Sequence, residues 1–118
     1  MPGEHRFPRR EHLTRTKDFQ HAYAEGGKWV GGAFVCYAIR QAGQGRKLGC
    51  TVSRKVGGAV ARNRVKRYLR EVYRVHRHEL PDDVHVVFIA RPAAATLNYQ
   101  ECAAAIRQLL QKGDMLSG

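Results

Sequence analysis

Apolar residues along the chain fall into three short runs that predict β-strands. The first run covers residues 33–39 and the second covers 47–53, and both are rich in residues that favour strands. Loop-forming residues at 41–45 separate them, so the two strands are predicted to form an antiparallel hairpin. The third run, at 84–90, is nearly all apolar and therefore predicts a buried strand.

Three other segments have the apolar spacing and the end signals of helices. They are predicted over residues 17–25, 59–80 and 98–112. Asn98 and Glu101 form a capping-box pattern at the start of the last helix. The order α-β-β-α-β-α predicts an α/β (α+β) fold, a two-layer sandwich of helices against a sheet.

The length of 118 residues suits one domain with one modest core, and no internal repeat divides it. Residues 1–15 contain two prolines and many charges, which is typical of a loosely held, basic N-terminal arm. A single folded domain is expected over 16–113, and a short C-terminal tail over 114–118.

The charge balance is strongly basic. Lys and Arg total 21 against 10 acidic residues, which gives a net charge of +11 and a pI near 10.2. Such a small domain is expected to bind a polyanion, with nucleic acid as the first candidate and an anionic membrane as the second. No run approaches the roughly 18 apolar residues of a membrane span, and no signal-peptide pattern opens the chain. A cytoplasmic protein without a membrane partner is expected.

The cysteines and histidines do not form metal-binding patterns. Cys36, Cys50 and Cys102 are scattered through apolar stretches without a CxxC pair, which predicts buried free thiols. His76 and His78 are two residues apart, so they point to different sides of a helix. The protein alone is expected to bind no metal.

The long helix has an apolar arc and a basic arc when its residues are placed at about 100° steps. The apolar arc consists of Ala61, Val65, Tyr68, Leu69, Val72 and His76. The basic arc consists of Lys66, Arg67, Arg70, Arg74 and Arg77, with Arg64 at its edge. Glu71 is the only acidic residue between positions 54 and 77.

This basic arc could be a solvated surface or a binding surface. A solvated face would carry mixed charges in pairs, because unrelieved like charges destabilise a helix. The single sign and the predominance of arginine instead favour contacts to phosphate oxygens. A DNA-reading helix would need a helix-turn-helix partner, whereas a strand and a glycine turn precede this helix. RNA is therefore favoured as the partner, and DNA is not.

The segment 55–71 resembles the RNR signature of the bacterial ribonuclease P protein family, because it contains Arg62-Asn63-Arg64 within a basic helix. Three further pieces fit the family in the same order, and these are Lys17-Asp18-Phe19-Gln20, Thr51-Val52-Ser53-Arg54-Lys55 and Ile89-Ala90-Arg91-Pro92. The resemblance covers roughly residues 13–112, nearly the whole chain.

The resemblance implies a protein subunit that supplies no catalytic side chain. The catalyst of the family is an RNA, and its Mg²⁺ ions are held mainly by that RNA and the substrate. The protein would bind the catalytic RNA and the 5′ leader of precursor tRNA, and so assist removal of the leader. The implied fold is that of the second domain of ribosomal protein S5, whose βαβ crossover is left-handed although general rules favour a right-handed one.

The resemblance also assigns roles to two sets of residues. Those expected to face the catalytic RNA are Arg62, Asn63, Arg64, Lys66, Arg67 and Arg70. Those expected to line a leader-binding cleft are Phe19, Tyr23, Tyr37, Thr51, Ser53, Arg54, Lys55 and Arg91. Strand alternation predicts that Thr51, Ser53 and Lys55 share one face. Without the resemblance, Phe19 and Tyr23 would be interpreted as ordinary core residues on one helix face.

Two other functions compete with this interpretation. A ribosomal or other structural RNA-binding protein would share the charge, but it would not need the RNR block together with Phe19 and Tyr23. A self-sufficient protein nuclease would usually need clustered carboxylates or a histidine pair. The acidic residues here are dispersed, apart from Asp82 and Asp83, which are typical of a helix stop.

Overall fold

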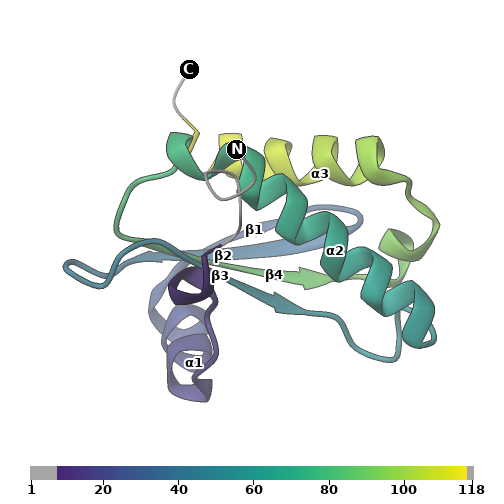
Figure 1. Ribbon diagram of the computed structural model, residues 1–118, viewed down its shortest axis with the longest axis horizontal. Coiled ribbons are helices and arrows are strands. Elements are labelled where there is room, and N and C mark those ends of the chain that lie inside the picture. The colour runs from purple at the N-terminus through teal and green to yellow at the C-terminus, as the bar shows by residue number, and fades with distance from the viewer. Residues whose placement is uncertain (1–7, 117–118) are drawn as a thin grey trace.

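A mixed four-stranded sheet forms the centre of the computed structural model, which describes residues 8–116 (Figure 1). In spatial order the strands are β1 (Gly27–Val30), β2 (Phe34–Arg40), β4 (Val84–Ala90) and β3 (Lys47–Thr51). β2 pairs antiparallel with both β1 and β4, whereas β3 pairs parallel with β4. The edges of the sheet are therefore β1 and β3.

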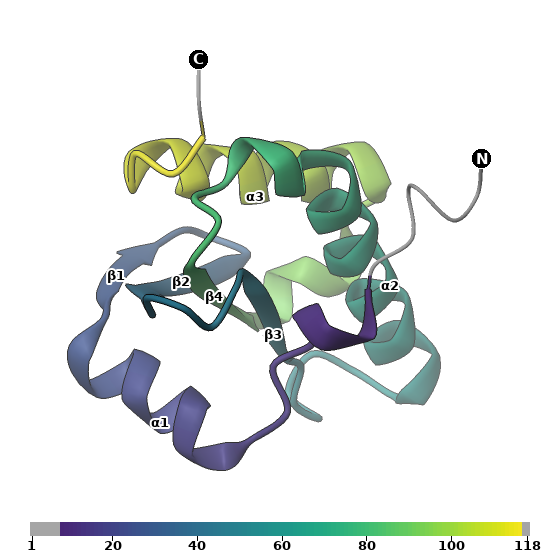
Figure 2. The ribbon, with the colours of Figure 1, turned by 60° about the vertical axis from the view of Figure 1, so that its left-hand side comes forward.

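The helices divide unequally between the two faces of the sheet. α2 (Ala59–His76) and α3 (Tyr99–Lys112) cover one face and form with it the predicted two-layer sandwich (Figure 1). α1 (Thr16–Glu25) lies on the other face, at one end of the sheet (Figure 2). Three short 3-10 helices complete the described chain, and they are η2 (Arg9–Glu11), η3 (Arg77–Glu79) and η4 (Pro92–Thr96).

The central strand β4 contributes to two apolar clusters because its side chains alternate between the faces. Val84, Val86 and Phe88 belong to the main core beneath α2 and α3. Val87 belongs to a smaller cluster beneath α1, with Leu13 and with partly buried neighbours. The sequence of a strand that is covered on both faces is apolar at nearly every position. The predicted buried strand at 84–90 is thus confirmed.

The crossover from β3 through α2 to β4 is left-handed. Figure 2 looks partly along these parallel strands, with β3 on the right of β4 and α2 on the upper side of the sheet. The chain passes from β3 up through α2 and returns on the left, so it turns anticlockwise as the strands run away from the viewer. This agrees with the family resemblance rather than with the general preference.

The prediction of an antiparallel hairpin between the first two strands was wrong. The strand at 34–40 pairs with β1 and β4, and β3 lies at the far edge, parallel to β4. β1 was not predicted at all, because its first residue, Gly27, belongs to the glycine pair that was assigned to the end of α1. Gly26 approaches the backbone of β2 too closely for a side chain, because a Cβ there would lie 2.7 Å from the carbonyl oxygen of Ala38.

The helix ends were predicted to within a few residues. α2 begins at Ala59 as expected but stops at His76, and η3 replaces its predicted last turn. Tyr73, which the helical projection left out of the apolar arc, is buried. The capping box of α3 is confirmed, because the Asn98 side chain accepts from the Glu101 N–H and the Glu101 carboxylate accepts from the Asn98 N–H.

The N-terminal segment is docked rather than loosely held over its described part, residues 8–15. The carboxylate of Glu11 is buried and accepts hydrogen bonds from the Tyr73 hydroxyl at 2.5 Å and from Nε of Arg77 at 3.0 Å. Leu13 is also buried, and its N–H donates to the carbonyl oxygen of Leu48 at 2.8 Å. The arm prediction was therefore wrong here, and residues 1–7 lie outside the described residues.

The predicted C-terminal tail is also packed over its described part. The side chain of Met115 is buried, and its N–H donates to the carbonyl oxygen of Leu110 at 2.9 Å. Leu116 packs partly against the main core. The single domain therefore extends on both sides of the predicted 16–113 range, and residues 117–118 lie outside the described residues.

The buried Glu11–Arg77 ion pair generates a stability prediction. Glu11→Gln should lower the free energy of unfolding at neutral pH by about 3 kcal/mol, because it leaves a buried guanidinium without its counter-charge. Burial alone raises the pKa of Glu11, but hydrogen bonds from Arg77 and Tyr73 and the nearby charges lower it overall below 4.5. The contribution is therefore fully present above about pH 4.5 and is lost as pH falls through the lower folded-state pKa.

Urea unfolding of the wild type and the variant between about pH 7 and about pH 3 measures this effect. The difference in stability should shrink as the pH falls below about 4.5. Glu25→Gln, a change at an exposed carboxylate on α1, is the matched control and should alter stability little. A difference that stayed constant across the range would mean that the charge of Glu11 does not stabilise the fold.

Candidate nucleic-acid interface

α1 is held against the sheet by an aromatic ring that lies on a glycine. Phe19 packs over Gly49 of β3, where a Cβ would lie only 2.6 Å from Cε1 of the ring. Phe19 also joins the small cluster around Leu13, Ala22 and Val87. It is thus partly a core residue, as its sequence alone suggested, and it fixes α1 over one end of the sheet.

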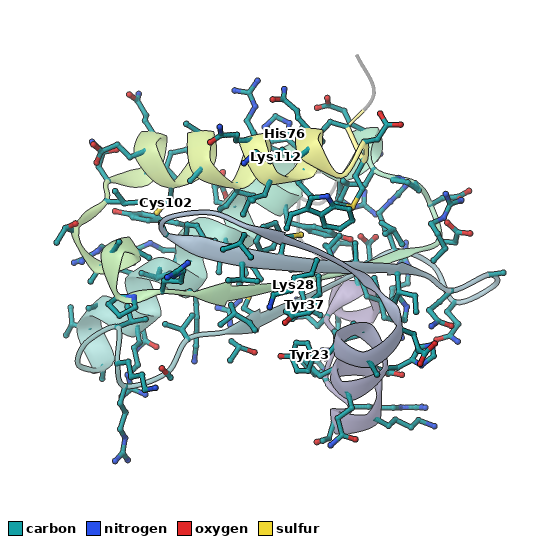
Figure 3. All side chains as sticks on the ribbon, turned by 180° about the vertical axis from the view of Figure 1, so that it is seen from behind. Tyr23, Lys28, Tyr37, His76, Cys102 and Lys112 are labelled. Atoms are coloured by element: carbon teal, nitrogen blue, oxygen red, sulfur yellow. The ribbon has the colours of Figure 1, made fainter. Side chains whose placement is uncertain are left out.

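Two tyrosines extend from this anchor onto the part of the sheet that α1 leaves open. The rings of Tyr23 on α1 and Tyr37 on β2 meet edge to face, with centroids 4.9 Å apart, and Phe19 lies 6.4 Å from Tyr23 (Figure 3). The hydroxyl oxygens of Tyr23 and Thr51 are 3.4 Å apart. Tyr23 keeps 37% of its surface exposed. Four of the predicted cleft residues are therefore brought together.

The other predicted cleft residues lie at the ends of the open face. β3 ends at Thr51, so Ser53 and Lys55 lie in a turn, and the prediction that they share a strand face with Thr51 was wrong. Ser53, Arg54 and Lys55 are all exposed in this turn, which leads to Gly57 and then to α2. Arg91 follows β4 and donates from Nη1 to the carbonyl oxygen of Gly31 at 3.1 Å.

The basic surface of α2 is shorter than predicted. Arg77 is buried against Glu11, and Nε of Arg74 donates to Glu71 at 3.0 Å, so these two cations have acidic partners within the fold. The predicted basic arc was therefore wrong for its C-terminal half. The remaining basic surface lies in the first three turns of α2, next to the turn that contains Arg54 and Lys55.

Within these three turns the predicted residues differ in exposure. Asn63, Arg67 and Arg70 are exposed, whereas Arg62, Arg64 and Lys66 are partly buried. Arg64 also has a structural contact, because its Nη2 donates to the carbonyl oxygen of Ala95 at 2.6 Å. Arg67 and Arg70 are therefore the cations of the set that a ligand can reach most freely.

The cysteines are free, as predicted, and they are poor nucleophiles at neutral pH. Burial raises the pKa of the Cys36 thiol to about 12 and that of Cys102 to about 11. Burial also raises the pKa of Cys50 to about 12, although Arg70 and Lys66 act in the opposite direction. Cys50 is only partly buried, unlike the other two.

Several acidic side chains of the described residues have structural partners. Glu11, Glu71 and Asp83 pair with arginines, and Glu101 caps α3. Residues 8–116 contain no group of three or more His, Cys, Asp or Glu side chains that could hold a metal ion. No helix in the same range is long and apolar enough to cross a membrane.

Lys28 is a member of the open face that sequence reasoning missed. Its Nζ lies 5.7 Å from the centroid of the Tyr37 ring, in the strand β1 that was not predicted. The sequence signal for this strand was weak: a tryptophan and a valine between glycine pairs. The position of Lys28 beside Tyr37 follows only from strand pairing.

Comparison with known sequences identifies relatives of this chain along most of its length. A sequence profile of the Ribonuclease P family matches residues 7–114. The ribonuclease P protein component of Desulfovibrio desulfuricans is 40% identical over 109 residues, which cover 89% of this chain and 84% of the relative. That of Dictyoglomus thermophilum is 41% identical over 87 residues, which cover 73% of this chain and 72% of the relative.

Solved structures with the same fold agree with the sequence relatives. The RNase P protein of Staphylococcus aureus superposes with a TM-score of 0.84 at 27% identity, over 91% of this chain and 98% of that protein. The RNase P protein of Thermotoga maritima superposes with a TM-score of 0.77 at 26% identity, over 92% of this chain and 99% of that protein. The profile match spans every residue of the two surfaces described above.

Proposed function

The chain belongs to the ribonuclease P protein family, and it is thus a subunit of an endoribonuclease complex that also contains an RNA. We propose that its two surfaces bind two different RNAs of that complex. The first three turns of α2 bind the catalytic RNA. The open face of the sheet binds the unpaired 5′ leader of precursor tRNA. Cleavage of the leader, which produces the mature tRNA 5′ end, is carried out by the RNA in the cytoplasm.

The observation that carries the leader proposal is the contact between Tyr23 and Tyr37 on the uncovered part of the sheet. Aromatic faces stack on any base, so they suit a single strand whose sequence differs from one precursor to another. A core position for both rings would have left them buried, whereas Tyr23 is exposed and Tyr37 is partly so. Arg54 and Lys55 add positive charge at one end of this face.

The surface of α2 suits a different part of the complex. Its exposed arginines can donate paired hydrogen bonds to phosphate oxygens, which positions a protein on RNA without reading its sequence. The acidic partners of Arg74 and Arg77 restrict this surface to the end of the helix next to the turn that contains Arg54 and Lys55. One protein can thus contact the catalytic RNA and the leader side by side.

Mg²⁺ in this reaction would be held by the RNA and the substrate. Mg²⁺ prefers oxygen ligands in octahedral geometry and is commonly bound through phosphates with few protein carboxylates. The acidic side chains described here form no cluster, and Glu11, Glu71 and Asp83 each pair with an arginine. The acidic side chains within residues 8–116 therefore do not fit a Mg²⁺ site of the protein's own.

The first prediction of the proposed function concerns which component carries out the cleavage. Rigorously RNA-free protein should not cleave precursor tRNA, whereas addition of the catalytic RNA at low Mg²⁺ should restore cleavage at the 5′ end. A gel assay with protein alone, RNA alone and both components measures this. Cleavage of the precursor by RNA-free protein would overturn the assignment of catalysis to the RNA.

The second prediction concerns α2. Arg67→Ala and Arg70→Ala together should weaken binding to the catalytic RNA by about 1–3 kcal/mol, because two charge-assisted contacts are lost. The slope of log affinity against log salt concentration should become shallower by up to about 0.9 for each lost phosphate contact. Filter binding at several salt concentrations measures both quantities.

The matched control for this pair is Arg107→Ala with Lys112→Ala. These residues are exposed on α3 and remove the same charge from a face that carries no assigned role. The control should bind the RNA almost as the wild type does. Equal losses in both double variants would mean that RNA responds to the total charge of the protein and not to α2.

The third prediction concerns the leader. Tyr37→Ala in the holoenzyme should weaken binding of precursor tRNA with a leader of several nucleotides by roughly 1–3 kcal/mol, which is the contribution of one stacked base. Affinity for mature tRNA should barely change, since it lacks the leader. Tyr37→Phe keeps the ring and should behave as the wild type.

Thermal melts of the free proteins provide the folding control for Tyr37→Ala, because the ring is partly buried. Tyr37 is preferred to Phe19 for this test, since Phe19 packs α1 onto β3 and its loss would disturb the fold. In a variant that folds normally, equal losses with leader-bearing and leaderless substrates would show that the leader does not lie on this face.

A further inference from the structure

Strand pairing brings a lysine into line with the aromatic residues of the open face. Lys28 of β1 lies opposite Tyr37 of β2, and Tyr37 lies opposite Val87 of β4. Val87 in turn lies opposite Gly49 of β3, over which Phe19 packs. Directly paired residues share a face of the sheet, so one row of side chains crosses it from the β1 edge to the β3 edge.

The contacts of Lys28 leave its ammonium group available. Lys28 is exposed, and no acidic side chain within residues 8–116 forms an ion pair with it. Its Nζ lies over the Tyr37 ring, whose other neighbour is the ring of Tyr23 (Figure 3). By contrast, Arg40, Arg74 and Arg77 each form an ion pair with a carboxylate.

The next row of the sheet contains no charge. Val30 pairs with Val35, Val35 pairs with Ile89, and Ile89 pairs with Thr51. A nucleic-acid strand on this face would thus meet apolar and aromatic groups in its middle. Positive charge lies at the ends of the face: Arg54 and Lys55 in the turn after β3, Arg91 after β4, and Lys28 on β1.

We propose that Lys28 binds a backbone phosphate of the leader, next to the base that stacks on Tyr37, and so positions the strand across the sheet. This rests on the proposed function of the open face. Stacking alone fixes neither the position nor the course of a strand, because every base offers a similar face. A lysine supplies a point charge for a phosphate, and phosphate contacts set the register of a bound nucleic acid.

The position of Lys28 also sets the order in which leader nucleotides reach each group. The basic turn and α2 lie on the β3 side, where the catalytic RNA is proposed to bind, and Lys28 lies on the opposite edge. A strand that leaves the RNA therefore crosses Tyr23 and Tyr37 before it reaches Lys28. The contribution of Lys28 should begin at the same leader length as that of Tyr37, or at the next nucleotide.

The test measures holoenzyme affinity for precursor tRNAs whose leaders are lengthened one nucleotide at a time. Lys28→Ala should leave short leaders unaffected and weaken longer ones by about two- to fivefold at low salt. The salt dependence for long leaders should become shallower by about 0.7, the value for one phosphate of a single strand. Lys28→Arg keeps the charge and should restore both affinity and slope.

Lys112→Ala is the matched control, because it removes one exposed lysine on α3, away from the open face (Figure 3). It should change neither affinity nor its dependence on leader length. The proposal would be overturned if Lys28→Ala matched the wild type at all lengths, or if it weakened leaderless tRNA equally.

Tyr37→Ala measured on the same leader series separates this proposal from the one on which it rests. If Tyr37→Ala loses affinity only with long leaders and Lys28→Ala loses none, the leader lies on this face and Lys28 does not position it. If neither variant responds to leader length, the proposed leader site itself is wrong. A loss for Lys28→Ala that begins at a shorter leader than that for Tyr37→Ala would refute the proposed course.

Discussion

The ring of Phe19 lies against the backbone of Gly49, and this contact determines how much of the sheet remains open. It holds α1 at one end of the face opposite α2 and α3, and a side chain at position 49 would force the Phe19 ring out of its present position. The rest of that face keeps only a partial cover, so Tyr23 and Tyr37 project over it. The main core lies beneath the face that α2 and α3 cover, and the open face remains accessible to the proposed leader.

The distribution of acidic residues shapes the second surface in a comparable way. Glu71 and Glu11 neutralise Arg74 and Arg77, and Glu11 at the same time docks the N-terminal segment onto the end of α2. The cations at the start of α2 have no such partners among the ion pairs of the described residues. The like charges there repel one another, a cost that a phosphate backbone would offset on binding.

The sequence alone determined the identity of most elements and much of the functional assignment. The nearly all-apolar run at 84–90 predicted a buried strand, and Asn98 with Glu101 marked the start of α3 through purely local hydrogen bonds. The RNR block and the aromatic pair at Phe19 and Tyr23 indicated the family that the comparisons confirmed. These signals are local, because each depends on residues within a few positions of one another.

Only the tertiary structure decided which elements lie next to one another and which charges remain free. Local pattern placed β3 beside β2, but β4 lies between them. β3 pairs parallel with β4, and the long α2 crossover makes this pairing possible. The helical projection placed Arg74 and Arg77 on the basic face. In the structure Arg74 pairs with Glu71, and Arg77 is buried against Glu11. Lys28 gained its place beside Tyr37 through the pairing of a four-residue strand too short to predict. Each of these outcomes depends on contacts between residues distant in the chain, which no local pattern encodes.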